Sequence, residues 1–369
     1  MKRVCLVAVA VLGVFVFGCA KKPIKIGVIV PLSGSISSYG DMCLKGIQLA
    51  IEGINKKGGI NSSQVELLVE DDKGDPDAAE VAIEKLDKAG VVAVIGPLTT
   101  TNVINIAEYA DKVGLPVLTP SATGVEATRD RQWVWRISCT DMAQGIALAT
   151  FAKEDLRFAT ACIIFDAGDP YSIGLTESFE AEFTKLGGKI LLKTTITPGD
   201  TAFEAPLKVV KEQKPDFIVV PLFYNNAGIL IKKARNMGLE QPFMGGDGLD
   251  SPELQKLVGN KKGAIYYSTH FFYNYGLAEV QDFLHSFWDK YGNEPQTFSA
   301  LGFDATRIVE KTFVTAKECS RKAFKENIGK IGLTGATGII SFTENKDPRR
   351  SLMVLKFEPG KPIETARVF

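Results

Sequence analysis

The sequence is poor in the side chains that most often bind metals or act as nucleophiles. Its 369 residues include two histidines, His270 and His285, and six cysteines. No CxxC pair is present and few zinc ligands are available, so we expect no metal site. The sequence also lacks a GxGxxG motif after its first predicted strand, a GxxxxGK(S/T) loop and a GxSxG turn. These absences disfavour a dehydrogenase or a hydrolase, and we expect neither enzymatic activity nor a cofactor.

The chain has no excess of charge of either sign. Lysine and arginine together number 43, as do aspartate and glutamate, so the formal net charge at pH 7 is zero. Without a polybasic segment, nucleic acid is not expected as a partner. A length of 369 residues with 45% hydrophobic content predicts two lobes, because single cores usually stop growing near about 250–300 residues.

One long apolar run occurs within residues 1–19, and it is short for a membrane-spanning helix. Lys2 and Arg3 precede this run, which is the pattern of an export signal. The run ends in VFGCAKK, which resembles a bacterial lipobox with Cys19 as the lipidated residue. Such processing predicts a lipid anchor on Cys19 and a mature domain in the periplasm or at the cell surface. The alternative, an uncleaved membrane anchor, is disfavoured by the short run.

Four cysteines remain once the export signal and Cys19 are set aside. They are Cys43, Cys139, Cys162 and Cys319. An oxidising compartment would permit a disulfide among them. Cys162 lies in the apolar run ATACIIF, which is typical of a small buried side chain. The spacing does not decide whether any pair forms.

Strands and helices alternate along the first third of the chain. The run IKIGVIV predicts a strand, and residues 41–57 place apolar side chains at helical spacing before the stop signal KKGG. The order repeats with strands QVELLVE, VVAVI and LPVLTP and with helices DPDAAEVAIEKLDKAG and NVINIAEYADKVG. This alternation predicts a doubly wound parallel sheet with its ligand site beyond the carboxyl ends of the strands.

A second series of the same kind follows the segment WVWRISC. Strands FATACIIFD, KILLKTTI, PDFIVVPL and PFMGG alternate with helices at 141–156, 171–187, 202–213 and 225–238. Helices near 277–290 and 297–318 are expected to return to the first lobe, before the strands TGIISFTEN and SLMVLKFEP cross again. The predicted fold is α/β, with two doubly wound parallel-sheet lobes that comprise residues 24–140 plus 271–343 and residues 141–270 plus 350–369.

Three consecutive threonines follow the predicted strand VVAVI, in the stretch IGPLTTTN. A helix N-cap needs one hydroxyl, and we expect Thr99 to cap or pack. Thr100 then offers a hydroxyl beside a helix N-terminus, an arrangement that suits a carboxylate. Thr101 is expected to serve the helix.

The next strand ends predict the rest of a binding site. PSAT supplies the hydroxyls of Ser121 and Thr123 with free backbone groups around Ala122. Asp247 stands between glycines in GGDGLD, and a buried aspartate needs a cation to face it. An α-amino acid carries a carboxylate and an ammonium on adjacent atoms, so it would satisfy both parts of the site.

Several motifs together are similar to the leucine/isoleucine/valine-binding family of periplasmic binding proteins. These are IKIGVIVPLSGSISSYG, INKKGGI, EDDKGDP, VIGPLTTT, LTPSAT and FMGGDG, within a resemblance that spans nearly all of the mature chain. It implies a type I periplasmic binding protein, whose two lobes are joined by three crossings and close over the ligand. It also implies a monomeric solute-binding component of an ABC importer, which delivers an aliphatic or branched-chain amino acid to a membrane permease.

The resemblance also implies roles for particular residues. Thr100 and Thr123 would hold the charged groups of the ligand, and Asp247 would pair with its ammonium. The full set of implied ligand-binding residues is Tyr39, Leu98, Thr100, Ser121, Ala122, Thr123, Tyr171, Tyr224, Asp247 and Phe298. The chain departs from the family at two places. Asp247 is one methylene shorter than the glutamate of the family's best-known members, and Gly74 and Thr99 stand where those members have a disulfide.

Two alternatives remain open. The ligand could instead be an amide, a urea-like solute or an aromatic acid, and the protein could be a sensor without a transport role.

Overall fold

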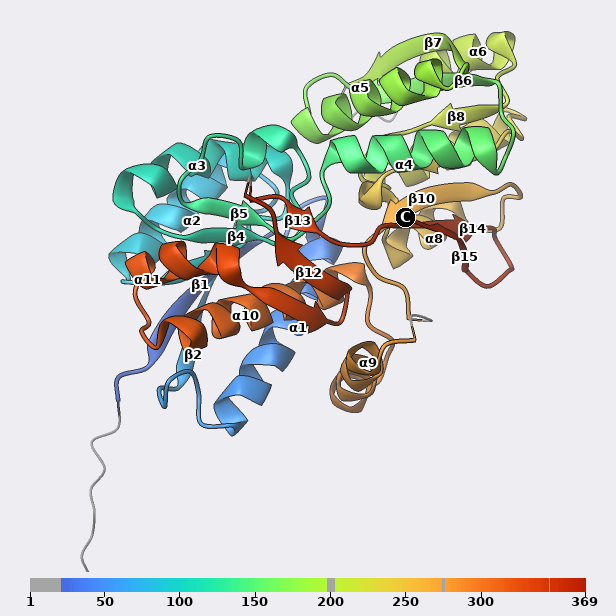
Figure 1. Ribbon diagram of the computed structural model, residues 1–369. Helices are drawn as coiled ribbons and strands as arrows, with labels where there is room; N and C mark the ends of the chain where they lie inside the picture. The colour runs from blue at the N-terminus through green and yellow to red at the C-terminus, as the bar shows by residue number, and fades with distance from the viewer. Residues whose placement is uncertain (1–20, 198–202, 274–275, 345) are drawn as a thin grey trace, which may run out of the picture.

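A computed structural model describes residues 21–197, 203–273, 276–344 and 346–369. The predicted export signal and Cys19 lie outside these residues, so both stay predictions. Two α/β lobes stand beside each other, and the chain passes between them three times (Figure 1). None of the helices in the described ranges is long and apolar enough to cross a membrane.

The first lobe is built on a five-stranded sheet in which every neighbouring pair is parallel. Its elements are β1 (Ile24–Val30), α1 (Ser37–Lys56), β2 (Val65–Asp71), α2 (Pro76–Lys88), β3 (Ala93–Ile95), α3 (Thr100–Val113), β4 (Val117–Thr119), the 3-10 helix η1 (Val125–Ala127) and β5 (Val134–Arg136). The strand order is β2-β1-β3-β4-β5. Every carboxyl end therefore lies at one edge of the sheet.

The second lobe is built on a seven-stranded sheet. Its elements are α4 (Asp141–Glu154), β6 (Thr160–Asp166), α5 (Pro170–Lys185), β7 (Lys189–Ile196), α6 (Glu204–Gln213), β8 (Phe217–Val219), α7 (Tyr224–Asn236), β9 (Phe243–Gly245), the 3-10 helix η2 (Asp247–Leu249), α8 (Pro252–Val258), β10 (Ile265–Thr269), β14 (Met353–Phe357) and β15 (Glu364–Val368). The strand order is β15-β14-β10-β9-β8-β6-β7.

The second sheet is parallel, as predicted, from β7 through β6, β8 and β9 to β10, and antiparallel at one edge. Strand β14 runs antiparallel to β10, and β15 runs antiparallel to β14. A parallel neighbour requires a long crossover, usually a helix. The chain instead reaches β14 directly from the first lobe and turns back at once into β15, so both strands join in the antiparallel direction.

The segment between β10 and β14 completes the first lobe. It contains α9 (Ala278–Tyr291), α10 (Thr297–Ala316), α11 (Arg321–Asn327), the 3-10 helix η3 (Ile328–Lys330) and the small antiparallel sheet of β11 (Gly332–Gly335), β12 (Gly338–Phe342) and β13 (Pro348–Arg349). Helices α9 and α10 were predicted from the sequence, whereas α11, β11, β13 and β15 were not. The lobe boundaries given in the sequence analysis stay predictions.

Helices α1 and α10 pack along each other in the first lobe (Figure 1). Two glycines allow the close approach. A Cβ atom on Gly46 would lie 1.9 Å from the Ser299 carbonyl oxygen, and one on Gly302 would lie 2.3 Å from the Cys43 carbonyl oxygen. Both neighbours are backbone atoms, which cannot rotate away as a side chain can. The pair of helices is therefore held at a distance that only glycine permits at these positions.

The start of α1 differs from the sequence expectation. The helix begins at Ser37 rather than Asp41, so Tyr39 belongs to its first turn. Serines and glycine make this turn look like a loop in the sequence. Its packing is decided by the surrounding fold, because a Cβ on Gly40 would lie 1.9 Å from the Pro31 carbonyl oxygen and Tyr39 is 1% exposed.

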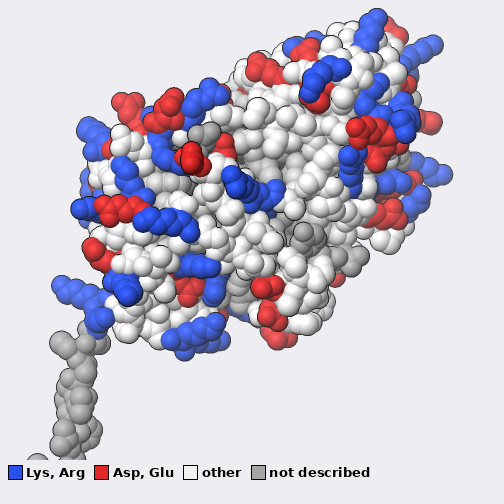
Figure 2. Space-filling model, in the orientation of Figure 1, with Lys and Arg blue, Asp and Glu red and all other residues white. Residues whose placement is uncertain are grey.

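The surface carries charges of both signs in the view of Figure 2, with mostly uncharged side chains over the middle of that face. The balanced composition is thus reflected in a surface of mixed charge, without a large patch of one sign on this side.

The cysteines in the described part of the chain, Cys43, Cys139, Cys162 and Cys319, carry free thiols. No group of three or more histidine, cysteine, aspartate or glutamate side chains is placed there to hold a metal ion.

Candidate functional site

A small enclosed cavity lies where the two lobes meet. The residues that line it are Tyr39, Leu98, Thr99, Thr100, Ser121, Thr123 and Phe298 from the first lobe and Tyr171, Phe223, Asp247 and Gly248 from the second. Eight of the ten residues named from the sequence are among them. The structure brings these eight together, and their contact with a ligand stays a prediction.

Hydroxyl groups form the first-lobe side of the cavity, at the carboxyl ends of β3 and β4. Thr99 is the N-cap of α3, as predicted, and its hydroxyl accepts a hydrogen bond from Asn102 N at 3.3 Å. Thr100 Oγ1 accepts from Gly124 N at 3.0 Å, which leaves its own hydrogen free to be donated. The N-terminus of α3 also favours negative charge. This side of the cavity is suited to bind a carboxylate.

Thr101 does not serve its own helix as expected. Its hydroxyl donates to Asp169 Oδ1 of the second lobe at 3.1 Å. Burial raises the pKa of Asp169 to about 6, and the hydrogen bond from Thr101 works in the opposite direction. The third threonine is thus a contact between the lobes, and its partner lies too far away in sequence to be identified from the local pattern.

Ala122 and Tyr224 lie behind the cavity wall rather than in it. Ala122 N donates to Thr119 Oγ1 at 3.1 Å and Ala122 O accepts from Ser138 Oγ at 2.8 Å, so the expected free backbone groups are occupied. Tyr224 packs edge to face against Tyr39, with ring centroids 4.9 Å apart. Both residues are therefore placed to support the wall residues.

Aromatic rings form the remaining walls. Phe298 stacks on Tyr39 with centroids 4.1 Å apart, and Phe223 stacks on Tyr171 at 5.3 Å. Phe223 was missed in the sequence, although it directly follows the predicted strand PDFIVVPL and precedes Tyr224. Neighbouring residues at a helix start point in different directions, so only the tertiary structure shows which ring faces the cavity. Such walls favour an apolar ligand group.

Asp247 is the carboxylate of the cavity, and no Lys or Arg of the described ranges forms an ion pair with it. It follows β9 as the first residue of η2, it is 6% exposed, and its backbone N–H donates to Gln144 Oε1 at 3.1 Å. Burial raises the pKa of Asp247 to about 7, with Gln144 lowering it and Asp250 raising it further. Within the described ranges, the one basic group within 4.0 Å is His270, at 3.7 Å.

His270 cannot act as that counter-charge in this environment. Burial, with a smaller effect of Arg350, lowers the pKa of His270 well below its usual value. The imidazole is therefore neutral near pH 7. A buried carboxylate without a facing cation is costly, so the site is suited to receive a cationic group from a ligand.

The lobes are closed around this cavity by hydrogen bonds between them. Tyr39 OH donates to Gly248 O at 2.5 Å, and Tyr224 OH donates to Ser35 O at 3.1 Å. The cavity between the lobes, of about 20 Å³, has room for little more than one water molecule. Entry and release of a ligand therefore require the lobes to part, as in hinge closure of two-lobed receptors.

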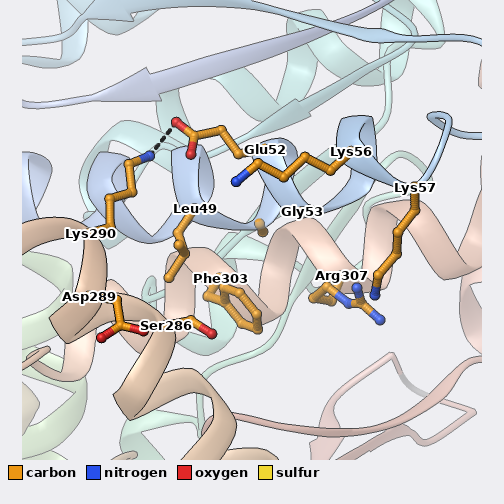
Figure 3. Close-up of a pocket in the computed structure, with 11 residues that line it drawn as sticks. Leu49, Glu52, Gly53, Lys56, Lys57, Ser286, Asp289, Lys290, Phe303 and Arg307 are labelled. Atoms are coloured by element: carbon orange, nitrogen blue, oxygen red, sulfur yellow. Dashed lines mark hydrogen bonds and ion pairs between the residues drawn. The ribbon is translucent and has the colours of Figure 1, made fainter.

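A larger hollow on the first lobe lacks these features. It is a groove of about 610 Å³ between α1, α9 and α10, against about 20 Å³ for the enclosed cavity (Figure 3). Figure 3 shows Lys290 paired with Glu52 across it, while Lys56 and Lys57 extend along its rim. These are long, exposed side chains with no buried polar group converging on one point. The enclosed cavity is the better candidate site.

The chain is similar to solute-binding proteins along most of its length. A family described as periplasmic binding protein matches residues 23–361. A Leu/Ile/Val-binding protein homolog of Brucella melitensis is 30% identical over 245 residues, which is 66% of this chain and 66% of that protein, or just under two thirds.

Two solved structures have nearly the same fold. A leucine-binding protein from Thermotoga maritima has a TM-score of 0.89 and 31% identity, over 94% of this chain and 98% of that one. A branched-chain amino-acid transporter substrate-binding protein from Streptococcus pneumoniae, in complex with isoleucine, has a TM-score of 0.88 and 31% identity, over 93% and 99%. With two α/β lobes and a family match over nearly the whole described chain, the protein belongs to the periplasmic binding protein family.

Proposed function

We propose that the protein binds an aliphatic L-amino acid between its lobes and delivers it to an ABC permease. The observation that carries the proposal is Asp247, a buried carboxylate whose one basic neighbour within 4.0 Å, among the described residues, is a neutral imidazole. The ligand's ammonium supplies the missing cation. The hydroxyl of Thr100 can donate a hydrogen bond to the ligand's carboxylate, and the N-terminus of α3 favours its negative charge.

The side chain of the ligand is proposed to be aliphatic and branched. The walls that remain after the two charged groups are placed consist of Tyr39, Tyr171, Phe223 and Phe298. Rings in this arrangement exclude water and pack against an apolar side chain. The names of the similar proteins, which specify leucine, isoleucine and valine, support the same ligand class.

The remaining parts of the proposal concern where the protein works. Cys19 carries a lipid that holds a monomeric binding protein at the outer side of the cytoplasmic membrane or at the cell surface, within reach of the permease. The lipobox-like sequence VFGCAKK supports the anchor. The protein acts by binding and release and not by catalysis, which is the mode of action of its family.

A thermal-shift and calorimetry screen tests the ligand class. The full chain is unfolded and refolded to remove bound ligand, then mixed with L-leucine, L-isoleucine, L-valine and their N-acetyl derivatives. A ligand at about 100 times its dissociation constant adds roughly 2.7 kcal/mol of stability. We expect stabilisation by the free amino acids and none by the acetylated compounds, because acetylation removes the ammonium that Asp247 requires.

The same screen separates the alternatives. Stabilisation by an amide, a urea-like solute or an aromatic acid, with no response to any amino acid, would show that the fold binds another ligand class. The role given to Asp247 would then be wrong. Uptake of the bound amino acid is then compared between cells that contain the protein's permease and cells that lack it. Uptake that depends on the permease would indicate transport, whereas binding without uptake in both would indicate a sensor.

Replacing Thr100 by valine tests the carboxylate side of the site. Valine keeps the shape but removes the hydroxyl, and a hydrogen bond to a charged partner contributes roughly 1.5–3 kcal/mol. We expect the dissociation constant for L-leucine to rise about 10- to 100-fold by calorimetry. Thr100→Ser keeps the hydroxyl and is the matched control, expected to bind nearly as the wild type. Equal affinity of the valine variant would remove Thr100 from the site.

A further inference from the structure

His270 lies between the hinge and the ligand cavity and contacts both. It follows β10 directly, where the chain makes its second crossing between the lobes, and it is fully buried. Its Nε2 accepts a hydrogen bond from Cys139 N, at 2.9 Å, in the first crossing. Its other ring nitrogen, Nδ1, lies 3.7 Å from Asp247 Oδ2. One imidazole therefore touches two hinge crossings and faces the carboxylate of the site.

The hydrogen bond from Cys139 decides where the proton of the ring is. A backbone N–H is always a donor, so Nε2 must be the acceptor nitrogen. A neutral imidazole then carries its hydrogen on Nδ1. That Nδ1–H has no hydrogen-bond partner among the described residues. A buried donor without a partner costs free energy, and the acceptor it faces across 3.7 Å is Asp247.

Arg350 holds the backbone of His270 in place. Its side chain lies in the third crossing and donates to Ile137 O at 2.5 Å and to His270 O at 3.3 Å. It also donates to Thr337 O of the first lobe at 3.4 Å. The three crossings are thus joined at one partly buried guanidinium, and a change in hinge geometry would move the His270 ring.

We propose that His270 is a positioning residue that couples the hinge to the ligand site by donating its Nδ1–H to the Asp247 carboxylate in the liganded state. The inference rests on the proposed function. Hydrogen bonds of this kind span about 2.7–3.2 Å, so a shift of less than about 1 Å forms the bond. An ammonium in the cavity keeps Asp247 ionised, and an ionised carboxylate is the stronger acceptor. His270 then holds Asp247 toward the ligand while the lobes are closed.

Nuclear magnetic resonance of the histidine rings tests the proposal directly. The sequence has two histidines, His270 and the exposed His285, so the full chain labelled with ¹⁵N-histidine gives two ring patterns. His285→Gln removes one pattern and assigns the other. We expect His270 to be the neutral tautomer with hydrogen on Nδ1, and this proton to move downfield when L-leucine is added. An Nε2–H tautomer, or an unchanged Nδ1–H signal in protein saturated with L-leucine, would overturn the proposal.

Two substitutions separate positioning from a structural role. In His270→Gln the amide oxygen can replace Nε2 as acceptor for Cys139, but the donor to Asp247 is lost. In His270→Asn the amide NH₂ can replace Nδ1–H, but the acceptor is lost. We expect His270→Gln to raise the dissociation constant of L-leucine about tenfold. His270→Asn is expected to lower the melting temperature while it keeps most of the affinity. The reverse order of affinities would overturn the proposal.

A double-mutant cycle with Asp247→Asn completes the test. If His270 acts through Asp247, His270→Gln adds no further loss of affinity once Asp247 is replaced. Independent, additive losses would show that His270 supports the fold alone. Failure of the wild-type chain to bind L-leucine would instead overturn the proposed function and this inference with it, and calorimetry distinguishes that result from binding without a His270 response.

Discussion

Replacing Asp247 by asparagine is expected to weaken L-leucine binding on the order of a thousandfold, the largest effect of any single change in the cavity. The substitution keeps the shape but leaves the ligand's ammonium buried without a counter-charge, which costs about 3–5 kcal/mol. Calorimetry on the full chain measures the change. Glu253→Gln removes a partly exposed carboxylate on α8 and is the matched control, expected to bind as the wild type.

Although Asp247→Asn should lower the affinity for ligand, it should not lower the stability of the unliganded protein. Among the residues that the structure describes, no cation faces the buried Asp247 carboxylate of the wild type, and asparagine removes the cost of that burial at pH 8. We therefore expect the variant to be at least as stable as the wild type without ligand. An unchanged dissociation constant, or a variant that fails to fold, would contradict the assignment of Asp247 as the ammonium site.

The pH dependence of the wild type follows from the same residue. Burial raises the pKa of Asp247 in the free protein to about 7, from 3.8. Ligand binding needs the ionised form, so affinity should fall about tenfold per pH unit below 7 and level off above it. Between about pH 4 and 7 the native state holds a proton that the unfolded chain has lost. The contribution of Asp247 to unliganded stability therefore decreases as the pH rises, and Asp247→Asn should reduce this slope.

Replacing Gly46 by alanine is expected to lower the free energy of unfolding by about 3 kcal/mol, at the upper end of the usual cost of overpacking. The new Cβ would lie 1.9 Å from the Ser299 carbonyl oxygen and 3.0 Å from Phe303 N, so α1 and α10 must separate. Tyr39 on α1 stacks on Phe298 of α10 in the cavity wall. The variant should therefore also bind L-leucine more weakly.

Gly53→Ala provides the control on the same helix. A Cβ at Gly53 has no heavy atom within 4 Å, apart from its own helix backbone and chain neighbours. Alanine should there stabilise the helix by about 0.5–1 kcal/mol. Urea denaturation of both variants separates crowding from helix propensity. A Gly46→Ala protein as stable as Gly53→Ala would show that α1 and α10 can move apart without cost.

The sequence determined the plan of the lobes because the signals for it are local. Helical spacing of apolar side chains, glycine stop signals and short apolar runs each act within a few residues, and their alternation implies a doubly wound sheet. The carboxyl ends of parallel strands share one edge. For that reason the sequence alone predicts that Thr100 and Thr123 lie at the same edge of the first sheet. That Asp247 of the second lobe belongs to the same site was an implication of the family resemblance.

The tertiary structure decided everything that depends on a distant partner. It showed that Thr101 contacts Asp169 across the lobes and that Phe223 faces the cavity. The antiparallel edge of β14 and β15 depends on where the last hinge crossing enters the second sheet.

His270 is the clearest case of such dependence. No local pattern in the sequence assigns His270 a partner. Its significance comes from Cys139, 131 positions earlier, and from Asp247, which follows a different strand. Local patterns determine helices, strands and strand ends. The pairing of buried polar groups is set by how the lobes close, because only closure brings those groups within hydrogen-bonding distance.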